Sequence, residues 1–168
     1  MGMTKTFAPQ YERTEEGWVI FPRDVEYRKS LFPPEVMKHP AKFNLYLVES
    51  LVEYLTLPGQ TVLDPFAGSG SIMVAALLGR KVKVIELEPH YAETLRESAL
   101  SFEEGMIWVS EGDCRQLLPV PCDCVITSPP YSNISRTSPL PDLKGEILPY
   151  MSHPLNLGRL SDFYFVQA

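Results

Sequence analysis

The sequence predicts an α/β fold: a three-layer sandwich in which helices cover both faces of a mostly parallel sheet. Four short apolar segments are typical of strands, at residues 61–64, 81–86, 106–110 and 122–127. Segments with a helical pattern stand between them. Each strand segment is apolar along nearly its whole length, as expected for parallel strands that are buried on both faces.

Three segments carry the helical pattern. Residues 43–57 have an apolar stripe at helical spacing, with Asn44 as a fair N-cap and Pro58 just beyond the end. The stripe consists of Val48, Leu51, Val52 and Leu55. Residues 70–79 are apolar on nearly every side, which predicts a helix packed deep against the sheet. Residues 88–105 have proline in the first turn and end in glycine, which predicts the third helix.

The composition indicates a globular protein of one domain, which we expect in the cytoplasm. The chain has 168 residues, of which 45% are hydrophobic. It has no apolar run of about 18 residues and no signal-peptide core. Its formal net charge of −6 argues mildly against nucleic-acid binding by the chain as a whole. Three cysteines argue against a disulfide framework, and we expect reduced thiols.

Residues 61–70, TVLDPFAGSG, place an acid and two glycines directly after the first strand. Ligands of open parallel sheets bind beyond the carboxyl ends of the strands. A phosphate-binding P-loop is excluded because no lysine follows Gly70. A dinucleotide loop is disfavoured, since Met73 replaces the third glycine and Asp64 would crowd a pyrophosphate. The turn therefore favours a cationic nucleoside cofactor without a phosphate, which the glycines let approach the backbone closely.

Acidic residues end three of the predicted strands. Asp64 is placed to receive an ammonium group or bound water, Glu86 both hydroxyls of a ribose, and Asp113 an adenine amine. Glu86 follows Asp64 by 22 residues, near the separation of about 20 typical of a ribose-binding acid. Each acid alone could cap a helix, but three together favour a ligand site. These are the contacts that S-adenosylmethionine requires.

Residues 127–133, TSPPYSN, follow the fourth strand. Two consecutive prolines give an extended backbone without amide donors, so nearby carbonyl oxygens remain available as acceptors. Ser128 adds a hydroxyl group and Tyr131 a flat apolar face. Such a loop suits an amine on a planar ring, and it needs no strong nucleophile, because the enzyme contributes positioning and electrostatics. A base inside a duplex must first be flipped out.

Together these motifs resemble those of the S-adenosylmethionine-dependent DNA amino-methyltransferases, which methylate the exocyclic amine of cytosine or adenine. LDPFAGSGS resembles their cofactor loop, VIELEPHY and EGDCRQL two further cofactor motifs, and TSPPYSN the catalytic motif. Residues 39–60 resemble the segment that precedes the cofactor loop and backs the methionine end. The matching positions there are His39, Pro40, Lys42 and Phe43. The match covers about residues 32–133 and implies a Rossmann-like methyltransferase fold.

The resemblance implies a site-specific DNA methyltransferase that uses S-adenosylmethionine and no metal, and that acts on a flipped base of double-stranded DNA. It also implies a cytoplasmic location of prokaryotic or phage type. The expected catalytic residues are Ser128, Pro129, Pro130 and Tyr131. The expected cofactor-binding residues are Lys42, Phe43, Asp64, Pro65, Phe66, Ala67, Gly68, Gly70, Glu86, Leu87 and Asp113. Serine at the start of the catalytic motif is typical of cytosine-N4 enzymes, whereas aspartate or asparagine is more typical of adenine. An adenine-N6 enzyme, an RNA or protein amine methyltransferase, and a non-catalytic half of a split enzyme are the alternatives.

Three segments are expected: an irregular N-terminal segment (1–38), the cofactor-binding and catalytic core (39–133), and a Pro-rich loop with the start of a helix (134–168). Complete relatives have three more strands and a target-recognition region, which this sequence does not show. We therefore expect a truncated chain or one half of a split enzyme, with a second polypeptide or the missing half as partner. The basic candidates for phosphate contacts are Arg136 and Lys144.

Overall fold

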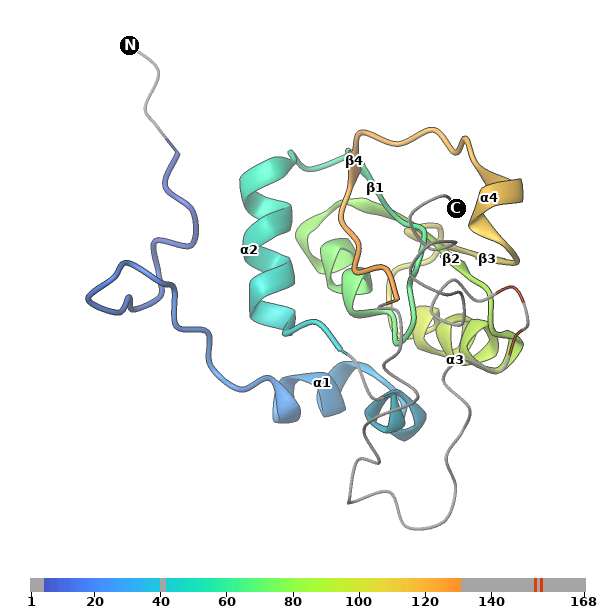
Figure 1. Cartoon of the computed structure of the whole chain (residues 1–168), viewed down its shortest axis with the longest axis horizontal. Helices are drawn as coiled ribbons and strands as arrows, with labels where there is room; N and C mark the ends of the chain where they lie inside the picture. The colour runs from blue at the N-terminus through green and yellow to red at the C-terminus, as the bar shows by residue number, and fades with distance from the viewer. Residues whose placement is uncertain (1–4, 40–41, 131–152, 154, 156–168) are drawn as a thin grey trace.

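The computed structural model describes residues 5–39, 42–130, 153 and 155 (Figure 1). The α-helices are α1 (Val25–Leu31), α2 (Leu45–Leu55), α3 (Pro89–Ala99) and α4 (Cys114–Leu117), and the 3₁₀ helices are η1 (Pro34–Lys38) and η2 (Ser71–Leu78). The strands are β1 (Thr61–Asp64), β2 (Lys81–Glu86), β3 (Ile107–Glu111) and β4 (Cys124–Val125). Tyr131, Arg136, Lys144 and the helix expected near the C-terminus lie outside the described residues.

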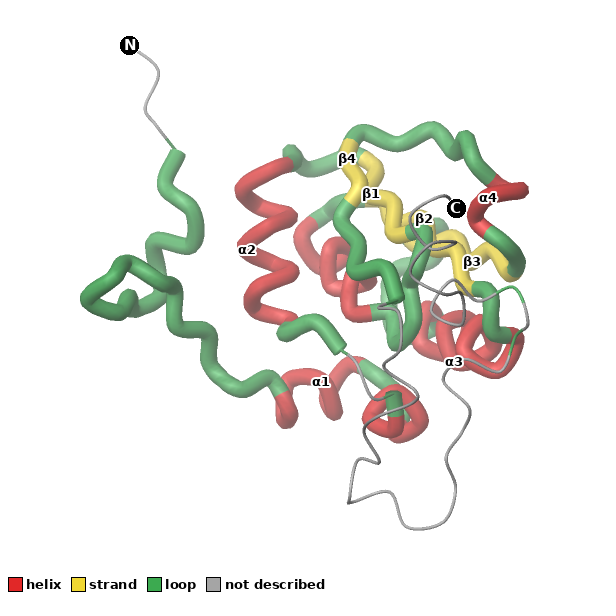
Figure 2. The backbone as a smooth tube through the Cα atoms, viewed as in Figure 1, coloured by secondary structure: helices red, strands yellow, loops and turns green. Residues whose placement is uncertain are grey.

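The four strands form one parallel sheet in the order β3-β2-β1-β4. Figure 2 shows them as a row between the helices. The chain runs outward from β1 to β3 and then returns to place β4 on the other side of β1. The topological switch point therefore lies at the carboxyl ends of β1 and β4, where such sheets bind their ligands. This arrangement confirms the predicted α/β fold.

The sheet has an apolar core on each face. The larger core joins Val62 and Val82 to buried side chains of α2, η2 and α3. The smaller core, on the opposite face, joins Leu63 and Ile85 to Cys114 of α4. Burial of a Val or Leu side chain stabilises the fold by about 1.5–3 kcal/mol. The second layer is the thinner one, and Trp108 on β3 stays 44% exposed.

Helix α2 begins as the sequence predicts. The side chain of Asn44 accepts hydrogen bonds from the backbone amides of Tyr46 (3.0 Å) and Leu47 (3.2 Å), and such a cap is worth about 1 kcal/mol. Val48 and Val52 of the predicted stripe are fully buried, whereas Leu55, at the end of the helix, is 52% exposed. The strands at 61–64 and 81–86 have the predicted bounds.

The prediction that residues 1–38 are irregular is wrong for their second half, which contains α1 and η1. Helix α1 has seven residues, too few to show an apolar stripe in the sequence. Proline begins η1 at a position that tolerates its missing amide, so the Pro-Pro pair starts a helix there. In the first half of the segment, an isolated antiparallel bridge pairs Arg13 with Val19.

Two further helices differ from the prediction. The segment after the first glycine turn is a 3₁₀ helix, η2. Helix α3 ends at Ala99, before Gly105, because the amides of the next three residues bond to the third carbonyl back. This tighter turn brings Phe102 against Phe32, with ring centroids 6.0 Å apart. Among the described helices, none has the length and apolar character needed to span a membrane.

Candidate cofactor and target site

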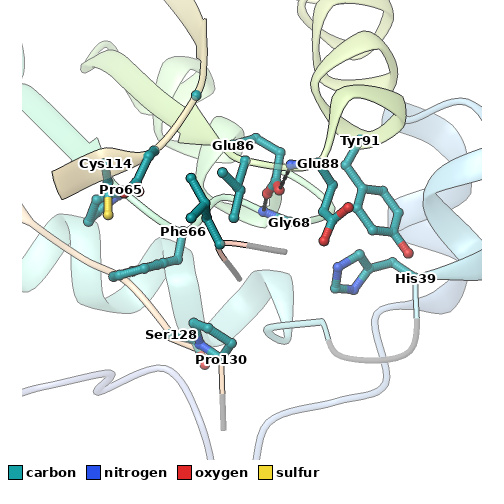
Figure 3. Close-up of a pocket in the computed structure, with 14 residues that line it drawn as sticks. His39, Pro65, Phe66, Gly68, Glu86, Glu88, Tyr91, Cys114, Ser128 and Pro130 are labelled. Carbon is teal, nitrogen blue, oxygen red and sulfur yellow. Dashed lines mark hydrogen bonds between the residues drawn. The ribbon is translucent and has the colours of Figure 1, made fainter. Parts of the chain in front are cut away.

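An open pocket with about 560 Å³ of empty space lies at the carboxyl ends of the strands, where the sequence motifs meet (Figure 3). The predicted site residues that line it are Pro65, Phe66, Gly68, Glu86, Leu87, Asp113, Ser128 and Pro130. Those outside the lining are Lys42, Phe43, Asp64, Ala67, Gly70 and Pro129. The lining also includes His39, Glu88, Tyr91, Gly112, Cys114 and Leu155. The pocket thus joins the cofactor loop to the start of the catalytic motif.

Glu86 lies at the centre of the pocket, at the end of β2, and is 8% exposed. One carboxylate oxygen accepts the amide of Gly68 (2.7 Å) and the other accepts the amide of Glu88 (2.8 Å). Each oxygen has a further lone pair, so both can also accept hydroxyl protons of a ligand. Burial raises the pKa of Glu86, although the two amides oppose that shift. The side chain is therefore held in place before any ligand binds.

The lining is acidic. Besides Glu86 it contains Glu88 and Asp113, and none of the described lining residues is lysine or arginine. Such a pocket disfavours phosphate groups and favours a ligand with positive charge and hydroxyl groups. This agrees with the exclusion of a P-loop from the sequence. Among the described residues, no group of three His, Cys, Asp or Glu side chains is arranged to hold a metal ion.

The two glycines of the first turn are required by close packing within the protein. Gly68 has φ +51°, and a Cβ atom there would lie 2.9 Å from Nε2 of His39. Gly70 has φ +76°, and a Cβ atom there would lie 2.6 Å from the side chain of Leu95. Both conformations are ones that side-chain-bearing residues avoid. The glycines thus let His39 and helix α3 pack closely against the loop. The sequence analysis had instead explained these glycines by the close approach of a ligand.

One wall of the pocket consists of His39 and the start of α3. His39 is 3% exposed, and its ring lies 4.6 Å from that of Tyr91. The carboxylate of Glu88, 1% exposed, accepts the amide of His153 through both oxygens, at 3.0 and 3.1 Å. Figure 3 shows these side chains beside Gly68. Glu88 and Tyr91 both lie in VIELEPHY, and the resemblance of that segment to a cofactor motif was their sequence signal.

Asp64 was expected to face the ligand, but its carboxyl group holds two chain segments together. Its Oδ1 atom accepts the amide of Phe66 (3.0 Å) and the hydroxyl group of Thr127 (2.6 Å). Asp64 is 5% exposed, and burial raises its pKa to about 6, with both hydrogen bonds opposing the shift. It therefore joins the end of β1 to the residue that precedes the catalytic motif.

Asp113 lies at the pocket edge and also begins α4. Its carboxylate accepts the amide of Arg115 (2.9 Å) and forms an ion pair with the guanidinium of the same residue (2.7 Å). The hydrogen bond from the Arg115 side chain lowers the pKa of Asp113. Beside it, the thiol of Cys114 lines the pocket, and burial raises the pKa of that thiol. An adenine amine would have to share the Asp113 carboxylate with Arg115.

Lys42 and Phe43 were predicted to bind the cofactor, but their contacts are with neighbouring parts of the chain. The Lys42 ammonium donates to the carbonyl oxygens of Met37 (3.1 Å) and His39. The carbonyl oxygen of Phe43 accepts from the guanidinium of Arg28. Burial comes first among the causes that lower the pKa of Lys42, followed by the charge of Arg28. Both residues shape the chain around His39 without lining the pocket themselves.

Arg28 ties helix α1 to the cofactor loop. It is 1% exposed, donates to Oγ of Ser71 (2.9 Å) and pairs with Asp24 (2.7 Å). Asp24 in turn accepts the amide of Leu45 at the start of α2. Removing one member of a buried ionic network costs about 3–5 kcal/mol. Sequence reasoning assigned no role to this segment, because its partners are distant in the chain.

Ser128 and Pro130 line the pocket opposite Glu86, near the ring of Phe66 (Figure 3). Two prolines fix the extended course of this loop and leave its carbonyl oxygens without competing amides of their own. The loop therefore presents a hydroxyl group and acceptor oxygens to the same space that the acids line. A ring that carries an amine would find proton acceptors there.

The family model of the N6/N4 DNA methylases matches residues 4–97, more than half of the chain. The protein therefore belongs to this family of DNA methylases. The family's methyl donor is S-adenosylmethionine. The acidic lining fits this cofactor, which carries a positive charge and a ribose.

Individual relatives match part of the chain. The type II methyltransferase M.BglI of Bacillus subtilis is 44% identical over 73 residues, which make up 41% of this chain and 21% of that protein. The type II methyltransferase M2.DpnII of Streptococcus pneumoniae is 39% identical over 61 residues, 36% of this chain and 23% of that protein. The crystal structure of TrmN from Thermus thermophilus has a TM-score of 0.45 at 25% identity and covers 58% of this chain and 32% of TrmN. The match thus spans less than a third of each of these proteins.

Proposed function

We propose that the protein transfers a methyl group from S-adenosylmethionine to the exocyclic amine of a flipped base in double-stranded DNA, with N4 of cytosine as the preferred target. One observation carries the proposal: the acidic pocket and the loop at Ser128–Pro130 share a single space at the switch point of the sheet. A methyl donor bound among the acids would therefore lie next to an amine bound by that loop.

The chain's own residues have two tasks at the cofactor. S-adenosylmethionine supplies a methyl group that the positive charge on its sulfur already activates. Glu86, held by the amides of Gly68 and Glu88, fixes the ribose, and the three acids of the lining favour a cationic ligand. The wall of His39 and Tyr91 limits the space beside the glycine turn.

The loop at residues 128–130 orients the target. The Ser128 hydroxyl and the neighbouring carbonyl oxygens accept the protons of the amine, which directs its lone pair toward the methyl group. As the new N–C bond forms, the bond between the methyl carbon and sulfur breaks and its electron pair stays on the sulfur, which becomes neutral. The proton that the amine loses passes to solvent. Positioning of this kind supplies much of the rate enhancement in such reactions. Tyr131, which lies outside the described residues, is proposed to stack on the base.

The preference for cytosine rests on serine at the first position of the catalytic motif, and adenine N6 is the second candidate. An RNA or protein amine is a third target, and a non-catalytic half of a split enzyme is the alternative of a different class. We propose that a second polypeptide or further chain completes the DNA-binding part, because the relatives are several times longer than the matched segment.

The test begins with calorimetric titration of the whole chain with S-adenosylmethionine. Unmethylated DNA, RNA and protein are then incubated with the chain and labelled cofactor, and the DNA is digested for nucleoside analysis. N4-methylcytosine confirms the proposal, whereas N6-methyladenine corrects the base. Label in RNA or protein alone contradicts the DNA substrate, and activity that appears only with a second polypeptide favours the split enzyme.

The variant Tyr131→Ala should bind S-adenosylmethionine with unchanged affinity and lose methyl transfer, because it removes only the stacking surface for the base. Loss of one aromatic stacking partner costs about 1–3 kcal/mol, a rate or affinity loss of roughly 5- to 150-fold. Cys122→Ser, at an exposed thiol outside the pocket, is the matched control. Normal methylation by Tyr131→Ala would contradict the stacking role.

A further inference from the structure

The seam between β1 and β4 leads directly into both loops of the site. At the amino-terminal end of these strands, the backbone amide of Asp123 donates to the carbonyl oxygen of Thr61 (2.9 Å). The side chain of Asp123 accepts the amide of Thr61 (2.7 Å). The amide of Ile126 then donates to the carbonyl oxygen of Leu63 (3.1 Å), and backbone pairing ends there. The next residues along the two segments are Asp64 and Thr127, and a hydrogen bond between their side chains follows the backbone pairing.

A single carboxylate oxygen serves both loops. Oδ1 of Asp64 accepts the amide of Phe66 in the cofactor loop and the hydroxyl group of Thr127 at the entrance to the target loop. Phe66 and Ser128, the residue after Thr127, both line the pocket, whereas Asp64 and Thr127 do not. The oxygen thus fixes the distance between two pocket walls from behind them.

The target loop, residues 128–130, has few other groups that could hydrogen-bond to β1 and fix its position there. Prolines at 129 and 130 have no amide hydrogen with which to extend the pairing of β4. β4 itself has two residues in its strand. Within the described part of the chain, the Thr127 hydroxyl therefore makes the last hydrogen bond between this segment and β1.

We propose that the Thr127–Asp64 hydrogen bond sets the position of the target loop relative to the cofactor loop, so that Thr127 is a positioning residue for methyl transfer. The inference rests on the function proposed above. A residue that only fills space at this point would tolerate the isosteric change Thr127→Val, which keeps the shape and removes the donor. A positioning hydroxyl would tolerate Thr127→Ser, which keeps the donor and removes a methyl group.

The first test compares these two variants, after circular dichroism has shown that both are folded. Thr127→Val should lower kcat about tenfold, the size expected for losing one charge-assisted hydrogen bond, with cofactor Kd and DNA KM changed less than about twofold. Thr127→Ser should keep most of the wild-type kcat. The proposal is overturned if the valine variant keeps its kcat, or if the serine variant is impaired as severely as the valine variant.

A second readout does not depend on activity. Burial raises the pKa of Asp64 to about 6 and the bond from Thr127 opposes that rise, so Thr127→Val should move the titration of Asp64 to higher pH. The titration is measured as the pH dependence of unfolding, each variant being compared with the same variant carrying Asp64→Asn. Glu86, the neighbouring acid with a raised pKa, cancels in that difference.

The two readouts separate failure of the inference from failure of the proposed function. If the wild-type chain methylates no substrate, alone or with the polypeptide that completes it, the proposed function fails, and the titration alone then tests the Thr127–Asp64 hydrogen bond. An Asp64 titration midpoint that rises in Thr127→Val and is unchanged in Thr127→Ser supports the hydrogen bond. A midpoint that is the same in wild type and Thr127→Val overturns the inference.

Discussion

The buried side of the site, at the ends of β1 and β2, carries two acids that form no ion pair among the described residues, whereas the acid after β3 pairs with an arginine. Asp64 and Glu86 are 5% and 8% exposed, and burial raises the pKa of each. Asp113 instead pairs with the partly exposed Arg115, whose hydrogen bond lowers the pKa of the Asp113 carboxyl. Acids in the same position after a parallel strand therefore do different work, because their surroundings decide which charge state is favoured.

The largest effect should come from Glu86 on the buried side. Glu86→Ala leaves the amides of Gly68 and Glu88 without their acceptor and removes the expected ribose contacts. An unsatisfied buried donor costs about 1–3 kcal/mol, so we expect unfolding free energy to fall by about 2–4 kcal/mol. Cofactor affinity should fall about 100-fold, equivalent to two lost hydrogen bonds to a charged group. Denaturant unfolding and calorimetric titration measure the two effects.

Glu86→Gln is the matched variant, since it keeps the shape and one acceptor oxygen. It should recover about half of the lost stability and little of the cofactor affinity. Equal cofactor affinity in wild type and both variants would show that Glu86 only supports the turn at Gly68.

The second effect concerns the charge of Asp64. Its pKa is about 6 in the folded protein against a usual value of 3.8, so folding takes up a proton between these values. The folded state then loses stability as pH rises through this window, by about 2–3 kcal/mol, and the loss is complete above the folded pKa. Asp64→Asn should abolish this part of the pH dependence and unfold at higher denaturant concentration at pH 7.

Urea unfolding of wild type and Asp64→Asn between pH 4 and pH 7 is the measurement. Two parallel stability curves would contradict the raised pKa. A variant that is less stable than wild type at pH 7 would show instead that the charged carboxylate is the stabilising form.

The smallest effect should come from Asp113, the acid that pairs with Arg115. Asp113→Ala removes the cap of α4 and should cost about 1 kcal/mol, whereas Asp113→Asn keeps a capping oxygen and should cost only a few tenths. Because the pKa of Asp113 is lowered, its stabilising charge is present at neutral pH and is lost as pH falls through the folded pKa. Thermal unfolding at pH 7 and at acidic pH measures both effects.

Cofactor titration of Asp113→Asn sharpens the comparison further. If an adenine amine uses this carboxylate, affinity should fall several-fold although stability hardly changes. Unchanged affinity would mean that Arg115 occupies the carboxylate in the bound state as well, and that Asp113 serves the fold alone.

Much of the architecture was predictable from local sequence. The bounds of β1 and β2 and the Asn44 cap follow from short apolar runs and from capping chemistry, which act over a few residues. The motif after each strand located the pocket, because parallel strands bring their carboxyl ends to one edge of the sheet. Eight of the predicted site residues line that pocket.

Tertiary structure decided the rest. Asp64 and Thr127 are 63 positions apart, and Arg28 and Ser71 are 43 apart, so no local pattern reports either bond. A separation of 29 positions likewise hides the close approach of His39 to Gly68. The sequence by itself determined which residues end at the ligand-binding edge, since strand and turn preferences are local. Which of those side chains face the pocket and which brace it from behind depends on packing between distant segments, and only the folded chain specifies that packing.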